Sequence, residues 1–260
     1  MDLHDYADVA ANYDYYLPSL GAYHFDGFCE FHANLAKKFG NGGILDIACG
    51  TGALTELFAE SGYDVMALDL SASMIDVTKE KLSQKRLNVD LLVANMTDFK
   101  IDRKFSLAVI ARGGFMHLLT AKEQRQALRN IKEHLADDGI LTFNHFQPHP
   151  VIQAERMKAD SDEYVLRSEY VNHEGKKERI FNAGKYDYIT QILHGVWKFE
   201  TLSGDDNVID TRVRPAVIRH TYRQEMEYLL ELCGYEIVGV YNSYRCDEAT
   251  NNFIWVVKSA

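Results

Sequence analysis

The sequence lacks several features that mark specialised classes of protein. No apolar stretch approaches the ~20 residues that a membrane-spanning helix requires. The acidic residues 1–5 do not have the basic-then-apolar pattern of a signal peptide. The four cysteines are scattered, with no C-x-x-C pair, which favours reduced thiols. We therefore expect a cytoplasmic protein that does not associate with a membrane.

The signatures of two common kinds of active site are also missing. No set of His, Cys and carboxylate residues has the spacing of a metal site, and no serine nucleophile elbow is present. His145 and His149 are four residues apart, but Pro148 between them argues against a helix that would align them. We expect no bound metal.

The chain has fewer basic than acidic residues: 28 Lys and Arg residues against 38 Asp and Glu residues, which gives a formal net charge of −10. This balance argues against long-range attraction to nucleic acid or anionic lipid, and it would favour a cationic substrate. The 260 residues, 47% hydrophobic and 25% charged, suit one α/β domain with an insertion.

A Gly-rich turn follows an apolar run near the start of the chain. Residues 44–52 are Ile-Leu-Asp-Ile-Ala-Cys-Gly-Thr-Gly, a helical segment follows, and a second apolar run ends in Asp69. This succession is typical of a nucleotide-type site at the carboxyl edge of a parallel sheet. The glycines let backbone approach a ligand. The Asp69 carboxylate could accept bonds from both ribose hydroxyls or, alternatively, cap the next helix with Ser71.

The block resembles motif I of the class I S-adenosylmethionine-dependent methyltransferases, in the form Leu-Asp-x-x-Cys-Gly-Thr-Gly. That family often has a glycine where this chain has Ala48. The dinucleotide fingerprint requires a third glycine three residues after Gly52, and this chain has Thr55 there. The resemblance implies S-adenosylmethionine as cofactor. An NAD(P)-dependent oxidoreductase and a non-enzymatic S-adenosylmethionine-binding protein remain as alternatives.

Apolar runs and helical periodicities alternate along most of the chain, which predicts an α/β fold with a parallel sheet. The resemblance implies a Rossmann-like, doubly wound sheet of seven strands in the order 3-2-1-4-5-7-6. The expected strands are 44–48, 64–69, 89–94, 105–111, 139–145, 235–241 and 253–257. The expected helices are 23–39, 53–61, 72–84, 121–136 and 222–233.

The composition changes between about 163 and 220, where Tyr, Val, Ile and Thr predominate. Turn sequences at 173–176 and 203–207 predict three or four antiparallel strands, and the charge run 176–179 predicts a solvated hairpin end. The predicted domains are a cofactor-binding core with N-terminal cap helices (1–150), an inserted antiparallel sheet over the substrate (151–220) and the completion of the core (221–260).

The ends of four successive strands are expected to hold the cofactor. The resemblance places Asp46 at its amino-acid end, with helix capping as an equal alternative. It places Asn95 and Met96 at the adenine, a role that Asp98 could share; a polar turn with Met96 in the core is the alternative. The expected cofactor contacts are Asp46, Ala48, Gly50, Gly52, Asp69, Leu70, Met74, Asn95, Met96, Ala111 and Arg112.

Two residues are expected to act in catalysis. His117 resembles the histidine of a Gly- or Ser-rich His-Leu segment in sugar amine N-methyltransferases, and Gly113 and Gly114 suggest close approach of backbone to the ligand. Those enzymes also carry an N-terminal Tyr-Asp beside the donor methyl, where this chain has Tyr13-Asp14. Structural packing is the alternative for both residues.

The Tyr13 and His117 pair predicts amine methylation of a small molecule or a peptide terminus, with His117 as proton acceptor and Tyr13 as a positioning group. The sequence leaves the acceptor open, as well as the choice between monomer and homodimer.

Overall fold

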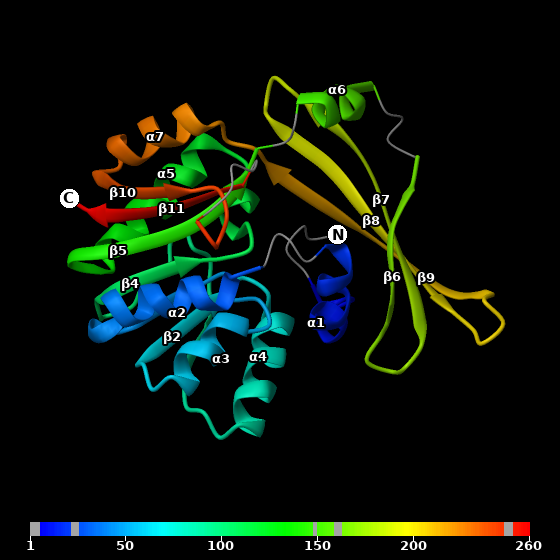
Figure 1. The fold of residues 1–260 in the computed structure, drawn as a ribbon, viewed down its shortest axis with the longest axis horizontal. Helices are drawn as coiled ribbons and strands as arrows, with labels where there is room; N and C mark the ends of the chain where they lie inside the picture. The colour runs from blue at the N-terminus through cyan, green and yellow to red at the C-terminus, as the bar shows by residue number, and fades with distance from the viewer. Residues whose placement is uncertain (1–5, 22–25, 148–149, 159–162, 247–251) are drawn as a thin grey trace. The chain divides into compact units, whose positions relative to one another are not determined.

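The computed structural model describes residues 6–21, 26–147, 150–158, 163–246 and 252–260. The chain forms two compact units (Figure 1). The core unit comprises Phe25–Gln147 and Thr221–Ala260, and the insertion unit comprises Met1–His24 and Pro148–His220. The N-terminal segment therefore groups with the inserted sheet, whereas the predicted domains joined it to the core.

The core unit contains the expected seven-stranded sheet. Its order, β3-β2-β1-β4-β5-β11-β10, is the expected order 3-2-1-4-5-7-6, which is therefore confirmed. The first five strands pair in parallel, and β11 is antiparallel to both of its neighbours. The strands are β1 (Ile44–Ile47), β2 (Val65–Asp69), β3 (Asp90–Val93), β4 (Phe105–Ile110), β5 (Leu135–Phe146), β10 (Tyr235–Tyr241) and β11 (Asn252–Ser259).

Alternating side chains of the central strands supply two hydrophobic layers, one on each face of this sheet. Ile44 and Leu107 belong to the layer that packs against α2 and α3, whereas Leu45 and Ala108 belong to the layer that packs against α5 and α7. The doubly wound arrangement follows from this alternation. The helices are α2 (Phe28–Phe39), α3 (Ala53–Glu60), α4 (Ala72–Gln84), α5 (Ala121–Glu133) and α7 (Arg223–Leu232).

Two expected helix boundaries differ from the structure. Helix α5 begins with a capping box between Thr120 and Glu123, but it ends at Glu133, three residues before the expected end. Strand β5 then begins at Leu135 because this residue pairs with Phe105 of β4, a tertiary contact that overrides helical periodicity. Helix α2 begins at Phe28, and residues 23–25 of the expected helix lie outside the described residues.

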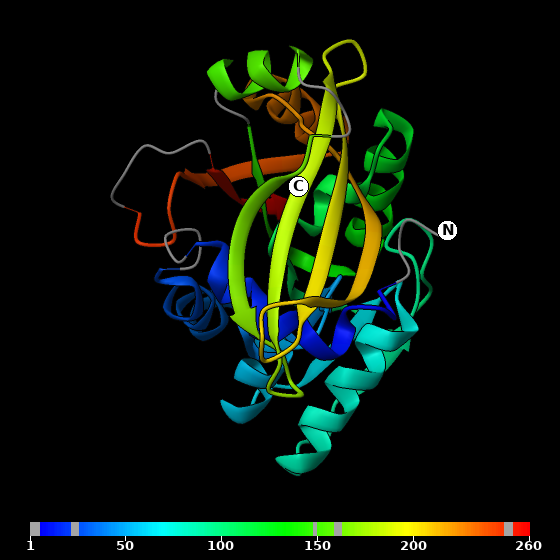
Figure 2. The same ribbon diagram turned by 90° about the vertical axis from the view of Figure 1, so that its right-hand side faces the viewer.

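The insertion unit contains the expected antiparallel sheet, built from four strands in the order β6-β7-β8-β9. They are β6 (Val165–Val171), β7 (Lys177–Asp187), β8 (Ile192–Leu202) and β9 (Val208–Arg219). Figure 2 looks onto these strands, which lie side by side as a curved sheet. Helix α6 (Pro150–Lys158), which was not expected, packs against β7. Pro150 at its first position is the signal that could have indicated it.

The N-terminal segment packs on one face of the four-stranded sheet. It consists of η1 (Ala10–Asn12), α1 (Tyr13–Tyr16) and η2 (Leu17–Leu20). Val9 and Tyr16 join Tyr170, Ile180 and Phe199 in one buried cluster. A helix of four residues has little stability by itself, so this packing determines where the segment lies.

Candidate functional site at the strand ends of the core unit

The Gly-rich turn after β1 and the acidic end of β2 are joined directly. The backbone N–H of Gly50 donates to Asp69 Oδ2 at 2.8 Å, and the backbone N–H of Ser71 donates to Asp69 Oδ1 at 2.8 Å. The two features that the spacing singled out therefore form one polar edge.

The two glycines of the turn have different surroundings. Both adopt left-handed backbone, with φ of 57° at Gly50 and 79° at Gly52. A Cβ at Gly52 would lie 2.6 Å from Thr78 Cγ2, so this glycine lets the turn pack against α4. A Cβ at Gly50 would meet no atom within 4 Å, so the backbone of Gly50 faces open space that a ligand could fill.

The Asp46 carboxylate forms a hydrogen bond with another residue of the core unit. Its Oδ2 accepts a hydrogen bond from the Thr55 hydroxyl at 2.6 Å, and its side chain is buried. Burial raises the pKa of Asp46 to about 7, opposed by the hydrogen bonds of Thr55 and reinforced by the charge of Asp69. Asp46 thus contacts the first turn of α3 through the Thr55 side chain, while Gly52 occupies the N-cap position of this helix. Thr55 is itself fully buried at the position of the absent third glycine.

Two neighbouring strands end in the same unusual way. Ala48 after β1 and Arg112 after β4 both have left-handed backbone, with φ of 54° and 52°. A Cβ at Gly114 would lie 3.0 Å from the Cβ of Ala48, so Gly114 lets the two turns pack closely. The packing explains Gly114 without a ligand. The guanidinium of Arg112 lies 5.1 Å from the centre of the Phe28 ring, a partner that sequence reasoning missed.

The end of β3 joins the same edge through backbone. The N–H of Ala94 donates to the carbonyl of Asp69 at 2.9 Å. Asn95 Oδ1 accepts from the N–H and the hydroxyl of Thr97, both at 2.9 Å, and forms a polar turn. Met96 is half-buried and packs against the core, whereas Asp98 is exposed.

The remaining expected contacts differ in exposure. Leu70, directly after Asp69, is 41% exposed, whereas Met74 in the first turn of α4 is 3% exposed. Ala111 and Arg112 are both half-buried where β4 ends.

His117 ends η5 (Gly114–His117), in the loop after β4, and is half-buried. The loop is held by Asn144 of β5, whose Oδ1 accepts from the N–H of Gly113 at 2.9 Å. Sequence reasoning missed Asn144, although a polar residue within a buried strand was a signal. Tyr13, the other expected catalytic residue, belongs to the insertion unit and is half-buried, with its ring edge-on to Tyr6 and Tyr16.

A buried histidine also lies near the end of β4. Burial lowers the pKa of His32 to about 4, and the positive charge of Arg112 adds to this effect, while the Phe28 carbonyl 2.8 Å from Nδ1 opposes it. Among the residues that the structure describes, no group of three or more His, Cys, Asp and Glu could hold a metal ion. In the same ranges, no helix has the length and apolar character needed to span a bilayer.

Residues 44–139 match the family described as "Methyltransferase domain". A methyltransferase-family protein of Geobacillus sp. (strain WCH70) is 31% identical over 123 residues, which are 46% of this chain and 50% of that protein. A dTDP-3-amino-3,4,6-trideoxy-alpha-D-glucopyranose N,N-dimethyltransferase of Streptomyces venezuelae is 33% identical over 98 residues, 38% of this chain and 40% of that protein. The dTDP-3-amino-3,6-dideoxy-alpha-D-glucopyranose N,N-dimethyltransferase of Streptomyces fradiae is 32% identical over 145 residues, 53% of this chain and 54% of that protein. The chain thus spans about half the length of these curated relatives, or less.

Solved structures extend the similarity to the whole chain. The CcbJ methyltransferase of Streptomyces caelestis has a TM-score of 0.77 at 21% identity, covering 99% of this chain and 97% of that one. An S-adenosylmethionine-dependent methyltransferase of Clostridium acetobutylicum has a TM-score of 0.74 at 16% identity, covering 90% and 91%. Residues 44–139 therefore resemble a methyltransferase domain, and the chain has the fold of solved S-adenosylmethionine-dependent methyltransferases.

Proposed function

We propose that this protein transfers a methyl group from S-adenosylmethionine to an amine nitrogen of a small molecule or of a peptide terminus. The observation that carries the proposal is the junction of the Gly50 turn with the Asp69 carboxylate at the edge of a parallel sheet. Two relatives are named as N,N-dimethyltransferases of amino sugars, which supports an amine as the acceptor.

The strand ends of the core unit fit an adenosine-bearing ligand. Open space beside the backbone of Gly50 admits a ligand at the turn. The half-buried Asp69 carboxylate can accept from ribose hydroxyls, in charge-assisted bonds stronger than neutral ones. Asn95 and Met96 would face the adenine. The other expected contacts lie near the end of a strand, in the turn after it or in the first turn of the next helix: Asp46, Ala48, Gly52, Leu70, Met74, Ala111 and Arg112.

S-adenosylmethionine, when bound, supplies a methyl group already activated by its positively charged sulfur. The protein's task is then to align the amine and to keep it neutral, since a protonated amine has no free electron pair. His117 would take the proton of the amine, directly or through one water. Tyr13 would orient the amine for attack, and such alignment alone can lower a barrier substantially.

A methyl-transfer assay with isotopically labelled S-adenosylmethionine tests the proposal. The acceptor panel comprises a dTDP-amino sugar, glycine, a tripeptide with a free amino terminus, and hydroxyl and thiol analogues of each. The proposal predicts label on nitrogen in at least one amine. Label found only on oxygen or sulfur would contradict N-methylation.

The same panel separates the proposed enzyme from a protein that only binds S-adenosylmethionine. Such a protein would bind S-adenosylhomocysteine in a titration and label none of the acceptors. An oxidoreductase would instead bind NADH. The buried Thr55 at the position of the third glycine argues against the oxidoreductase.

A further inference from the structure

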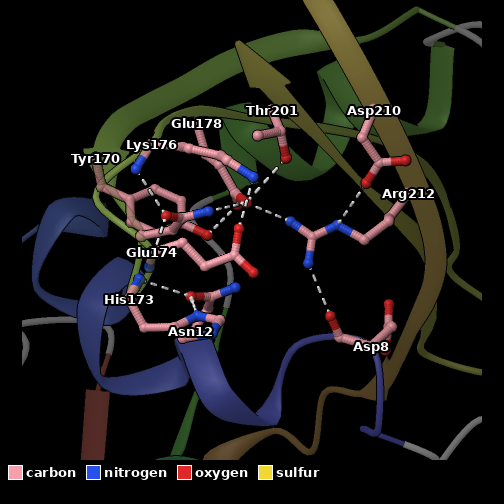
Figure 3. A network of polar contacts seen from close by, with 11 residues as sticks. Asp8, Asn12, Tyr170, His173, Glu174, Lys176, Glu178, Thr201, Asp210 and Arg212 are labelled. Atoms are coloured by element: carbon pink, nitrogen blue, oxygen red, sulfur yellow. Dashed lines mark hydrogen bonds and ion pairs between the residues drawn. The ribbon is translucent and has the colours of Figure 1, made fainter. Parts of the chain in front are cut away.

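A buried glutamate lies at the centre of a polar network in the insertion unit (Figure 3). Glu178 of β7 is 1% exposed, although it belongs to the charge run 176–179 that was expected to be a solvated hairpin end. Its Oε2 accepts from the Tyr170 hydroxyl. Its Oε1 accepts from Asn172 Nδ2 at 2.9 Å, Thr201 Oγ1 at 3.0 Å and Arg212 Nη2 at 2.6 Å.

Strand register places this network under the N-terminal segment. Tyr170, Glu178 and Thr201 are directly opposite one another on β6, β7 and β8. They share a face with Ile180 and Phe199, which lie two residues further along their strands and pack against Val9 and Tyr16. The face that buries the carboxylate is therefore the face that the segment covers.

Arg212 connects the carboxylate to the N-terminal segment. Its Nη2 binds Glu178, while its Nη1 donates to the backbone carbonyl of Asp8 at 2.8 Å. A planar guanidinium can hold both groups at once, whereas a lysine ammonium on a flexible stem fixes their relative geometry much less well. One side chain thus joins a buried charge in the sheet to the residues just before η1.

A second polar contact, between Asn12 and His173, holds the C-terminal end of η1 on the sheet. Asn12 Oδ1 accepts from the backbone N–H of His173 at 3.0 Å and lies 2.6 Å from His173 Nδ1. Asn12 is buried and directly precedes Tyr13, yet its side chain does not cap α1. The polar contacts at Asp8 and Asn12 therefore hold the residues that immediately precede Tyr13, the residue expected to orient the acceptor amine.

Stability alone is a weak reason for a buried charge in this place. A buried ion pair often stabilises a fold no more than apolar side chains of the same size, because both charges lose their hydration. Burial works to raise the pKa of Glu178, but hydrogen bonds from Tyr170 and Asn172 and the charge of Arg212 hold the pKa below its ordinary value. The carboxylate stays ionised and directional, as a group that fixes geometry requires.

We propose that Glu178 and Arg212 are positioning residues, which fix the N-terminal segment on the four-stranded sheet so that Tyr13 is held for methyl transfer. This inference rests on the proposed function for the role of Tyr13. The attachment itself rests only on contacts within the insertion unit.

Hydrogen exchange measured by mass spectrometry on the full chain tests the attachment. Glu178→Gln keeps the shape and removes the charge, and amides in residues 9–16 should then exchange about 10-fold faster, the factor expected for one weakened charge-assisted bond. Glu169→Gln is the matched control because Glu169 is an exposed glutamate of the same sheet, 2.8 Å from Arg179 Nε. It should leave this exchange unchanged. Equal exchange in wild type and Glu178→Gln would overturn the inference, whatever the turnover.

Steady-state kinetics with an amine that the acceptor panel shows to be methylated test the positioning role of Glu178. Glu178→Gln should lower kcat about 10- to 100-fold with an unchanged KM for S-adenosylmethionine, since misplacement by about 1 Å has effects of this size. In a Tyr13→Phe background, Glu178→Gln should not lower kcat further, because both substitutions impair the same positioning of the amine by Tyr13. Additive effects would overturn the inference in favour of general stability.

A second variant keeps the experiment decisive if Glu178→Gln does not fold. Arg212→Lys leaves Glu178 charged but cannot fix Glu178 and the Asp8 carbonyl with one planar fork, and it should give the same faster exchange and lower kcat. Absence of turnover by the wild-type protein on every acceptor would contradict the proposed function, and the exchange result would still decide whether the segment is attached in this way.

Discussion

Two buried carboxylates, one in each unit, show how differently the two regions hold their polar groups. Asp46 in the core unit is 2% exposed and Glu178 in the insertion unit is 1% exposed. Asp46 has a neutral hydroxyl as its closest partner, and burial raises its pKa to about 7. Glu178 has an arginine and three neutral donors, which lower its pKa despite burial. The number and charge of donors therefore decide the ionisation of a buried acid more than burial does.

The two units also differ in how far apart in the sequence their contacting residues lie. In the core unit, the Gly50 turn and Asp69 are 19 residues apart and meet through one strand-helix-strand unit. In the insertion unit, Arg212 and Asp8 are 204 residues apart. A site built on adjacent elements can be recognised from spacing, whereas a network that joins the two ends of a chain cannot.

The largest expected effect concerns chemistry at the end of β4. His117→Ala should lower turnover by roughly 10²–10⁴-fold, the usual contribution of a general base, without loss of affinity for S-adenosylhomocysteine. Single-turnover kinetics measure the effect. His194→Ala, at an exposed histidine of β8, is the control and should leave the rate unchanged. A His117→Ala protein as fast as wild type would assign this histidine to packing.

The next effect tests the raised pKa in the core unit. The folded protein holds a proton on Asp46 up to about pH 7, whereas the unfolded chain releases it near pH 4. The folded state therefore binds more protons in this window, and the free energy of unfolding falls as pH rises from about 4 to 7, by on the order of 3 kcal/mol from this group. Urea unfolding across this range should show the fall in wild type and a smaller one in Asp46→Asn. Parallel profiles would contradict the raised pKa.

Glu178 should have the opposite pH dependence. Its folded pKa is lowered, so its contribution to stability is present above pH 4.5 and is lost as the pH falls through the folded pKa. Glu178→Gln should lower the free energy of unfolding by about 1–3 kcal/mol at neutral pH, the value of hydrogen bonds to a charged group, and should remove this acid loss. Thermal unfolding at pH 7 and below pH 4.5 measures both. A variant as stable as wild type at pH 7 would show that the network contributes little.

The smallest effect concerns the turn after β1. Ala48 has a φ of 54°, a conformation that glycine adopts with less strain. Ala48→Gly should therefore raise the free energy of unfolding by up to about 1 kcal/mol, after the entropy that glycine gains in the unfolded chain is subtracted. Ala59→Gly in α3 is the control and should lower it by about 1 kcal/mol. A similar loss in both variants would show that Ala48 is not strained.

Most of the core unit could be predicted because its signals are local. Apolar runs located all seven strands, and the Gly-rich turn with Asp69 located the edge where they converge. The strand order came from resemblance to a family, since periodicity alone does not give the order of strands. The end of α5 was missed because pairing between Leu135 and Phe105 depends on a neighbouring strand.

The insertion unit could be predicted only as a set of antiparallel strands. Glu178 was assigned to a solvated turn because it lies among lysines and an arginine, and no local pattern shows that it faces the cluster around Phe199. Asn12 and His173 are 161 residues apart, and no sequence pattern in either segment predicts their contact. The roles of Tyr13 and His117 remain predictions for the same reason: they depend on an acceptor that the sequence does not encode in a motif.

Titration calorimetry with S-adenosylhomocysteine tests the central claim most directly. We predict saturable binding to the wild-type protein, no binding of NADH, and an affinity for S-adenosylhomocysteine that is roughly 1.5–3 kcal/mol weaker in Asp69→Ala because hydrogen bonds to a charged group are lost. Asp64→Ala, at an exposed carboxylate just before β2, should bind like wild type. Wild-type protein that does not bind S-adenosylhomocysteine, or an Asp69→Ala variant that binds it unchanged, would contradict the assignment of this edge as the cofactor site.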